Sequence, residues 1–293
     1  MYESLSAVAG FDTAAIRWDA DAYPERLWAG DPTVWSEDPI PDLADRLGWL
    51  QLHRTMPERV PEMVDLARSL VDDGVLDVVV CGMGGSSLAP DVFAHVIGSA
   101  PTYPKVTVLD STHPAAVETV ASAIDIERAA FVISSKSGTT LETLSFFRYF
   151  WDRTGGDGSR FIAITDPGTP LADLGEERGF RAVVLAPPDV GGRYSALTPF
   201  GLVPAALMGI DPQALLDRAA AFAADATGRP AAEDPAIALG LAWAAHALNG
   251  HDKLTFRTSP GLTAFPAWLE QLVAESLGKD GTGIVPIAGE PPL

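Results

Sequence analysis

Cysteine is almost absent from this 293-residue chain, in which Cys81 is the one thiol. A single cysteine excludes an internal disulfide framework, and a reducing compartment fits the sequence. Basic residues are scarce as well: 20 lysines and arginines stand against 39 aspartates and glutamates, which gives a net charge of −19. Such a charge argues against nonspecific binding to nucleic acid or to anionic membranes. An anionic ligand would therefore need a local positive site.

Long hydrophobic runs are missing too. No apolar stretch continues for the roughly 18 residues of a membrane-spanning helix, and the N-terminus lacks the apolar segment of a signal peptide. We therefore expect a cytoplasmic, soluble protein that does not contact a membrane. Internal repeats and low-complexity segments are also absent. With 47% apolar and 20% charged residues, the chain is long enough for one large or two medium globular domains.

What the sequence does contain is an alternation of short apolar segments with helical patterns. Strands are predicted at 76–81, 106–109, 129–133, 161–164 and 182–185, and helices at 61–72, 88–97, 114–123, 141–151 and 170–178. This order predicts right-handed βαβ units, and therefore an α/β fold with a five-stranded parallel sheet covered by helices on both faces. Ligands of such sheets bind beyond the carboxyl ends of the strands.

The segments on either side of this alternation have a different character. Residues 1–55 contain four tryptophans, and prolines interrupt any long helix there. After residue 188 the sequence predicts mainly helices, with one short strand, at 199–208, 212–227, 235–248, 254–256 and 264–277. We therefore predict an irregular or helical arm at residues 1–55, an α/β domain at 56–205, and a helical segment with an incomplete second α/β unit at 206–293.

The stretch from Ser134 to Thr143, SSKSGTTLET, lies between a predicted buried strand and a helix. Hydroxyl groups donate hydrogen bonds, and the N–H groups at a helix N-terminus carry the positive end of the helix dipole, so this turn can hold a dianionic phosphate. The expected donors are Ser135, Lys136, Ser137, Thr140 and Thr143. The alternative is that these side chains only cap the helix, for which a single hydroxyl would suffice.

Two glycine-containing turns are weaker signals when each is taken alone. The segment Gly82 to Ser87, GMGGSS, lacks the lysine of a P-loop and the spacing of a dinucleotide fingerprint. It therefore indicates only a tight turn or a close approach of the backbone to another group. Arg193 lies in the second turn, VGGRYS, and its guanidinium alone would also fit a surface salt bridge.

Four motifs together resemble the phosphoglucose isomerase family. They are GMGGSSLAP at 82–90, SSKSGTTLET at 134–143, VGGRYS at 190–195 and EQLVAESLGK at 270–279, and they occur in the family's order. The resemblance covers roughly residues 76–290 and implies a three-layer, doubly wound sugar-isomerase (SIS) domain at 56–205. The segments RLWAGDPTVW and RLGWL further resemble the isomerase half of bacterial transaldolase–isomerase fusions.

The resemblance implies an aldose–ketose isomerase of glycolysis and gluconeogenesis. It would interconvert glucose 6-phosphate and fructose 6-phosphate through an enediolate, without metal or organic cofactor, as a homodimer. Ser135, Lys136, Ser137, Thr140 and Thr143 would hold the sugar phosphate, with Gly85 and Ser86 lining the same pocket.

Two further residues would carry the chemistry. By resemblance, Arg193 would stabilise the enediolate and Glu275 would move the proton between C2 and C1. Abstraction of a proton next to a carbonyl requires a carboxylate base and a fixed cation, which these two residues supply. Gln271, four residues before Glu275 on the same helical face, could orient substrate. The alternative for Glu275 is a solvated carboxylate at a helix end.

The resemblance also implies a ring-opening histidine and a late lysine after the EQLVAESLGK motif. Residues 280–293 contain neither. We therefore expect a fragment or a short chain whose activity depends on residues outside this sequence. A sugar-phosphate-binding SIS module without catalysis is the alternative function. A nicotinamide-dependent dehydrogenase is disfavoured because its fingerprint is missing.

Overall fold

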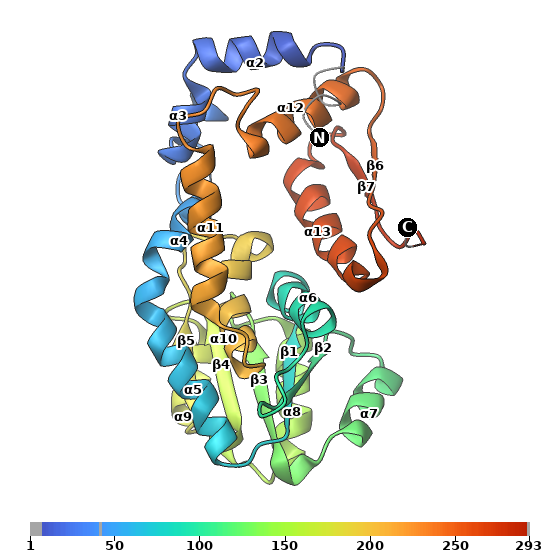
Figure 1. The fold of residues 1–293 in the computed structure, drawn as a ribbon. Helices are drawn as coiled ribbons and strands as arrows, with labels where there is room; N and C mark the ends of the chain where they lie inside the picture. The colour runs from blue at the N-terminus through green and yellow to red at the C-terminus, as the bar shows by residue number, and fades with distance from the viewer. Residues whose placement is uncertain (1–7, 41–42, 292–293) are drawn as a thin grey trace.

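The computed structural model describes residues 8–40 and 43–291. At its centre lies a five-stranded parallel sheet in the order β2-β1-β3-β4-β5 (Figure 1). The strands are β1 (Asp77–Gly82), β2 (Lys105–Leu109), β3 (Ala129–Ser134), β4 (Phe161–Thr165) and β5 (Ala182–Leu185). The predicted fold class is confirmed, and each strand ends within one residue of its predicted position.

Helices cover both faces of the sheet because alternate strand residues are apolar on both sides. Val78 and Val80 face a core built with α5 (Val60–Asp72), α6 (Leu88–Val96) and α10 (Pro199–Leu207). Val79 and Cys81 face the opposite core, built with α7 (Pro114–Ala123), α8 (Leu141–Arg153) and α9 (Pro170–Glu177). Strands buried on both faces are typical of parallel sheets. The result is the predicted three-layer arrangement.

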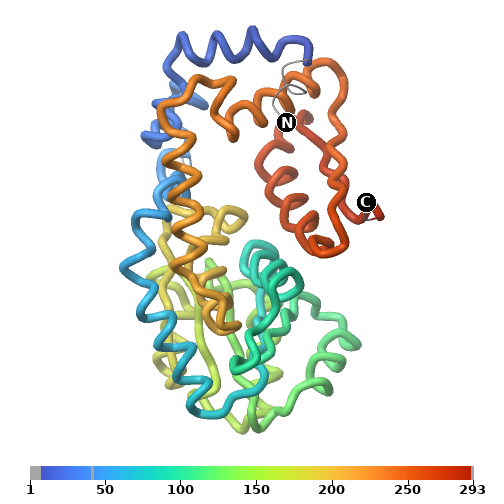
Figure 2. The backbone as a smooth tube through the Cα atoms, in the orientation of Figure 1, coloured from blue at the N-terminus to red at the C-terminus, as the bar shows by residue number. Residues whose placement is uncertain are grey.

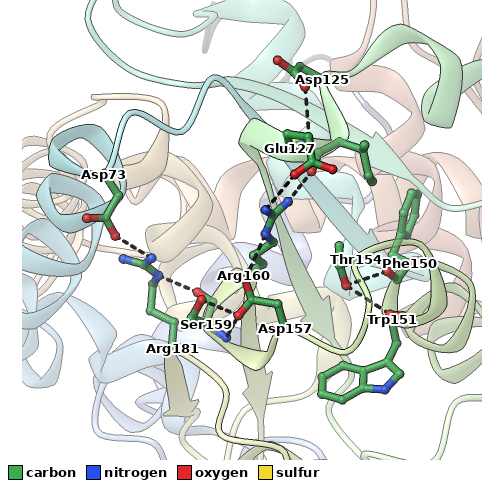
Figure 3. A network of polar contacts seen from close by, with 11 residues as sticks. Asp73, Asp125, Glu127, Phe150, Trp151, Thr154, Asp157, Ser159, Arg160 and Arg181 are labelled. Carbon is green, nitrogen blue, oxygen red and sulfur yellow. Dashed lines mark hydrogen bonds and ion pairs between the residues drawn. The ribbon is translucent and has the colours of Figure 1, made fainter.

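Two arginines join the loops at the amino ends of the strands (Figure 3). Arg160, just before β4, donates to the Ile126 carbonyl at 2.5 Å and pairs with Asp157 at 3.2 Å. Arg181, just before β5, pairs with Asp73 at the end of α5 at 2.6 Å. These contacts join loops at the amino ends of the strands, and residues 134–143 lie at the opposite, carboxyl ends. The carboxyl ends of the strands are therefore the edge where the loops of the predicted site lie.

A second group of helices lies beyond the layers that cover the sheet, although two of them reach the core of the sheet through Leu52 and Leu216. They are α2 (Phe11–Ala20), α3 (Tyr23–Trp28), α4 (Leu52–Thr55), α11 (Pro212–Ala226) and α12 (Pro235–Leu248). Phe11 and Ala15 of α2 pack on Ile237 and Leu241 of α12 in a separate small core. Figure 2 shows α11 running beside α4 between this core and the sheet. The predicted arm thus contains short helices; its residues 1–7 and 41–42 lie outside the described part of the chain.

The C-terminal part forms a strand–helix–strand unit. The strands β6 (Lys253–Thr255) and β7 (Val285–Ile287) pair in parallel, and α13 (Phe265–Leu277) connects them. Strand β7 was not predicted from the sequence. This unit agrees with the expected opening of a second α/β unit, while the division into three domains stays a prediction. Within residues 8–40 and 43–291, no helix is long and apolar enough to cross a membrane.

Candidate functional site

Two loops meet at the carboxyl ends of β1 and β3. The glycine loop, residues 82–87, follows β1, and the serine loop, residues 134–143, follows β3. Their first residues, Gly82 and Ser134, are direct neighbours in the sheet register. The buried Ser134 hydroxyl donates to the Ser86 carbonyl at 3.2 Å and joins the two loops. Ser86 and Ser134 are 48 residues apart in the chain, so two distant motifs form one surface.

The N-cap residue in the serine loop does not cap the N–H groups at the N-terminus of α8 with its side chain. Thr140 is the N-cap residue, yet its side chain makes no capping hydrogen bond. Its hydroxyl instead lies 2.8 Å from the hydroxyl of Ser135. Thr143, in the first turn of the helix, is fully buried, and its Oγ1 atom has no hydrogen-bond partner among the described residues. This arrangement disfavours the capping alternative, because the first N–H groups of α8 keep their capacity to bind an anion.

Lys136 is engaged within the protein. Its Nζ atom lies 2.5 Å from Asp166 Oδ2, just after β4, and 3.2 Å from the Pro188 carbonyl. Burial raises the pKa of Asp166, and the nearby ammonium of Lys136 opposes that rise. The Lys136 side chain therefore holds the serine loop against the ends of β4 and β5. Direct contact with a phosphate, which the sequence predicted, would require the ammonium to be shared with Asp166.

The tip of the serine loop is exposed. Ser137 Oγ accepts a hydrogen bond from the Thr139 N–H at 3.2 Å and lies 2.9 Å from the Thr139 hydroxyl. Thr139 was not among the predicted donors, although it belongs to the same SSKSGTT run. An anion at this tip would meet the hydroxyl groups of both residues.

Arg193 and Glu275 meet across 82 residues of sequence. Arg193 lies in η7 (Gly192–Leu197), and Glu275 lies near the end of α13. Arg193 Nη1 donates to Glu275 Oε1 at 3.0 Å, and Arg193 Nε donates to the hydroxyl of Ser276 at 2.8 Å. The Glu275 side chain is 51% exposed, whereas that of Arg193 is 23% exposed. The salt bridge that the sequence left as an alternative for Arg193 therefore exists, and its partner is the other predicted catalytic residue.

The glycine loop is the common neighbour of all these elements. A Cβ atom on Gly85 would lie 2.2 Å from the Gly192 carbonyl oxygen, and the Ser195 hydroxyl donates to the Gly85 carbonyl at 3.0 Å. Gly84, with a φ of +53°, lies against Gln271 of α13, whose Nε2 would be 2.7 Å from an added Cβ. The loop therefore contacts the serine loop, η7 and α13, and brings the four motifs together.

Gln271 and Ser86, two of the predicted substrate-contacting residues, differ in what their polar atoms contact. Gln271 Oε1 is buried and has no hydrogen-bond partner in the described chain. Ser86 is 9% exposed, and its backbone, not its hydroxyl, makes the contact with Ser134. Buried polar atoms without partners are uncommon in folded proteins, and a ligand is one group that can satisfy them. Gln271 therefore has a buried oxygen that a ligand could satisfy, and the substrate-contacting roles of both residues stay predictions.

This site combines the groups that proton transfer at a carbon atom next to a carbonyl requires. Glu275 is a carboxylate whose Oε1 atom is bonded to Arg193, and Oε2 makes no protein contact in the described chain. A carboxylate can accept a proton on such a free oxygen. The adjacent guanidinium can stabilise negative charge on a ligand oxygen. The serine loop, across the glycine loop, provides hydroxyl and N–H donors for a separate anionic group.

Comparison with known proteins agrees with this geometry. The family model described as phosphoglucose isomerase matches residues 67–284, a range that includes all four motifs. A glucose-6-phosphate isomerase of Rubrobacter xylanophilus is 32% identical over 83% of this chain and 60% of its own length. A probable glucose-6-phosphate isomerase of Haloquadratum walsbyi is 35% identical over 78% of this chain and 54% of its own length. The chain spans about half the length of the curated relatives it matches.

Solved structures show the same fold. A hypothetical protein from Thermus thermophilus is similar over 96% of this chain and 67% of its own, with a TM-score of 0.80 and 28% identity. A glucose-6-phosphate isomerase from Chlamydia trachomatis is similar over 96% of this chain and 58% of its own, with a TM-score of 0.70 and 24% identity. With the family model matching most of its residues and the four motifs meeting at one site, the chain belongs to the phosphoglucose isomerase family.

Proposed function

We propose that the protein interconverts glucose 6-phosphate and fructose 6-phosphate through a cis-enediolate. The observation that carries the proposal is the contact of Arg193 with Glu275, 3.0 Å between Nη1 and Oε1, beside the glycine loop. A carboxylate base and a fixed cation are the minimum for this chemistry, and these two residues bring them together. The names of the relatives support the same reaction.

In the proposed reaction Glu275 removes the proton from C2 of the open-chain aldose. The electron pair of that C–H bond forms the C1–C2 double bond, and the carbonyl electrons move to O1. Arg193 stabilises the resulting negative oxygen through N–H groups that its protein contacts leave free. The hydroxyl proton of O2 passes to O1, directly or through water, and return of the proton from Glu275 to C1 then leaves C2 as the carbonyl carbon of the ketose. The serine loop holds the phosphate group throughout and fixes the position of the reacting carbons.

The function is tested by measuring binding and turnover on the same chain. Isothermal titration with 6-phosphogluconate reports occupation of the site, and a coupled assay of fructose 6-phosphate conversion, read as NADPH formed by glucose-6-phosphate dehydrogenase, reports catalysis. Binding with turnover supports the proposal. Binding without turnover would support the alternative of a sugar-phosphate-binding SIS module, and a chain that does not bind the ligand would contradict both.

The serine loop gives a separate prediction for affinity. Thr140→Val removes the hydroxyl that lies 2.8 Å from Ser135 and keeps a side chain of similar shape. We expect the Kd for 6-phosphogluconate to rise about 10- to 150-fold, because a hydrogen bond to a charged group contributes about 1.5–3 kcal/mol. Thr119→Val is the matched control, since among the described residues the Thr119 hydroxyl bonds only within α7, to the Ala115 carbonyl. An unchanged Kd for Thr140→Val would remove Thr140 from the phosphate site.

The expected homodimer is also part of the proposal, on the basis of family membership. Sedimentation velocity at micromolar concentration should show a species of twice the 30.9 kDa chain mass. A single species of the chain mass under these conditions would contradict it.

A further inference from the structure

Ser276 makes contacts that the proposed reaction has not used. Its hydroxyl lies 2.8 Å from Arg193 Nε and 2.8 Å from the Tyr194 hydroxyl. The serine follows Glu275 directly on α13, while the other two residues are neighbours in η7. One hydroxyl group on the helix therefore connects the cation of the site to the side chain next to it.

The contact to Ser276 restricts how the Arg193 guanidinium can turn. With Glu275 alone, a single hydrogen bond would hold the group, and it could rotate about that bond. With a second hydrogen bond at Nε, two different nitrogens are held by two consecutive residues of α13. No further contact of Nη2 exists among the described residues, so this amino group can donate to a ligand oxygen.

Tyr194 is itself held in place from the other side. Its ring stacks on Trp49, with 5.1 Å between ring centroids and an angle of 12°. The Arg193 guanidinium lies 5.0 Å from the centroid of the same ring, within the range of a cation–π contact. Trp49 belongs to η2 (Gly48–Gln51), where the Gly48 N–H donates to the Asp189 carbonyl at 3.1 Å. A segment near the N-terminus, outside the family-model match, thus supports the arginine through two aromatic rings.

The donors and acceptors of Arg193 and Tyr194 explain why both contacts need a hydroxyl group at position 276. Arg193 Nε can only donate, so Ser276 Oγ accepts from it. The contact with Tyr194 uses one hydroxyl proton, whichever residue donates, and the other hydroxyl proton stays available for a ligand or water. Alanine would remove both contacts, whereas threonine would keep the oxygen that makes them.

We propose that Ser276 is a positioning residue that orients Arg193 toward the developing enediolate. This inference rests on the proposed isomerase function. Because small errors in the placement of a catalytic group lower the rate strongly, loss of Ser276 affects the charged, planar reaction state more than the bound ground state. A residue with a purely structural role would lower the affinity for both states equally.

The test compares two ligands on the intact chain. A five-carbon sugar hydroxamate 5-phosphate presents a planar anionic group like the enediolate, and sorbitol 6-phosphate presents the phosphate without that group. For Ser276→Ala, calorimetry is expected to show an affinity for the hydroxamate that is about 10- to 100-fold weaker. The affinity for sorbitol 6-phosphate should change by less than about threefold. Ser276→Thr should restore the preference for the hydroxamate.

A control variant and the unsubstituted chain distinguish a wrong role for Ser276 from a wrong proposed function. Ser122→Ala removes a hydroxyl that, within the described part of the chain, bonds only to the Glu118 and Thr119 carbonyls of α7. This variant should leave both affinities unchanged. If Ser276→Ala weakens both ligands equally or neither of them, the positioning role is wrong even though the site binds sugar phosphate. If the unsubstituted chain binds neither ligand, the proposed function fails and this inference fails with it.

Discussion

Glu275→Gln is expected to lower kcat for fructose 6-phosphate by about 10²- to 10⁴-fold, because a positioned general base contributes that much to the rate. The amide is nearly the same size as the carboxylate and can still accept the hydrogen bond from Arg193, whose Nη1 lies 3.0 Å from Glu275 Oε1. It cannot accept the proton from C1 of fructose 6-phosphate at neutral pH. The Kd for 6-phosphogluconate should therefore change by less than about threefold, which separates catalysis from binding.

Glu270→Gln is the matched control for this substitution. Glu270 lies on the same helix, α13, and is exposed, so the amide there should leave both the rate and the Kd unchanged. If Glu275→Gln keeps the full rate, another residue supplies the base. If the substitution instead weakens ligand binding as much as it lowers turnover, Glu275 contributes to substrate binding and does not act as the base.

Gly85→Ala is expected to have the largest effect among substitutions in the loops. The new Cβ atom would lie 2.2 Å from the Gly192 carbonyl oxygen, a backbone atom that cannot turn away as a flexible side chain can. The glycine loop and η7 would have to separate, which would also strain the contact of the Ser195 hydroxyl with the Gly85 carbonyl, now 3.0 Å. We expect the free energy of unfolding to fall by about 1–3 kcal/mol and the affinity for 6-phosphogluconate to fall at least about tenfold.

Gly240→Ala provides the control for the glycine substitution. Gly240 lies exposed within α12, and an added Cβ would meet no atom of residues 8–40 or 43–291 within 4 Å. Alanine at such a helical position should stabilise the protein by about 0.5–1 kcal/mol, and ligand affinity should be unchanged. Urea unfolding and calorimetry on both variants measure the two quantities. A Gly85→Ala protein with normal stability and affinity would show that the loops need not touch.

The central sheet could be predicted from the sequence because its signals are local. The five strands are runs of apolar residues such as VVVC and FVI, bounded by turn residues, and the helices between them carry their own apolar stripes. Strand β7 was missed for the same reason. Its three residues, Val285–Ile287, include a proline and lie among glycines, so no local pattern distinguishes them from a loop. Pairing with β6 defines that strand.

For the candidate site, the positions of the loops could be predicted from the sequence, whereas the contacts of their side chains could not. The serine loop and the glycine loop each fall at the end of a predicted strand, and parallel strands place their carboxyl ends at one edge, so their proximity followed from the predicted topology. The contacts of the charged side chains did not. Nothing in the local sequence indicates that Lys136 pairs with Asp166, or that Trp49 supports Tyr194.

Sequence alone therefore determined the elements of the sheet, the two loops at its carboxyl edge and the residue types available for phosphate binding and proton transfer. These features can be read from the sequence because strand, helix and turn preferences depend on neighbouring residues. Only the tertiary structure decided that Arg193 forms hydrogen bonds with both Glu275 and Ser276. The physical reason is that these hydrogen bonds join residues 82 and 83 positions apart in the chain, and their geometry depends on how α13 packs on α6 and η7.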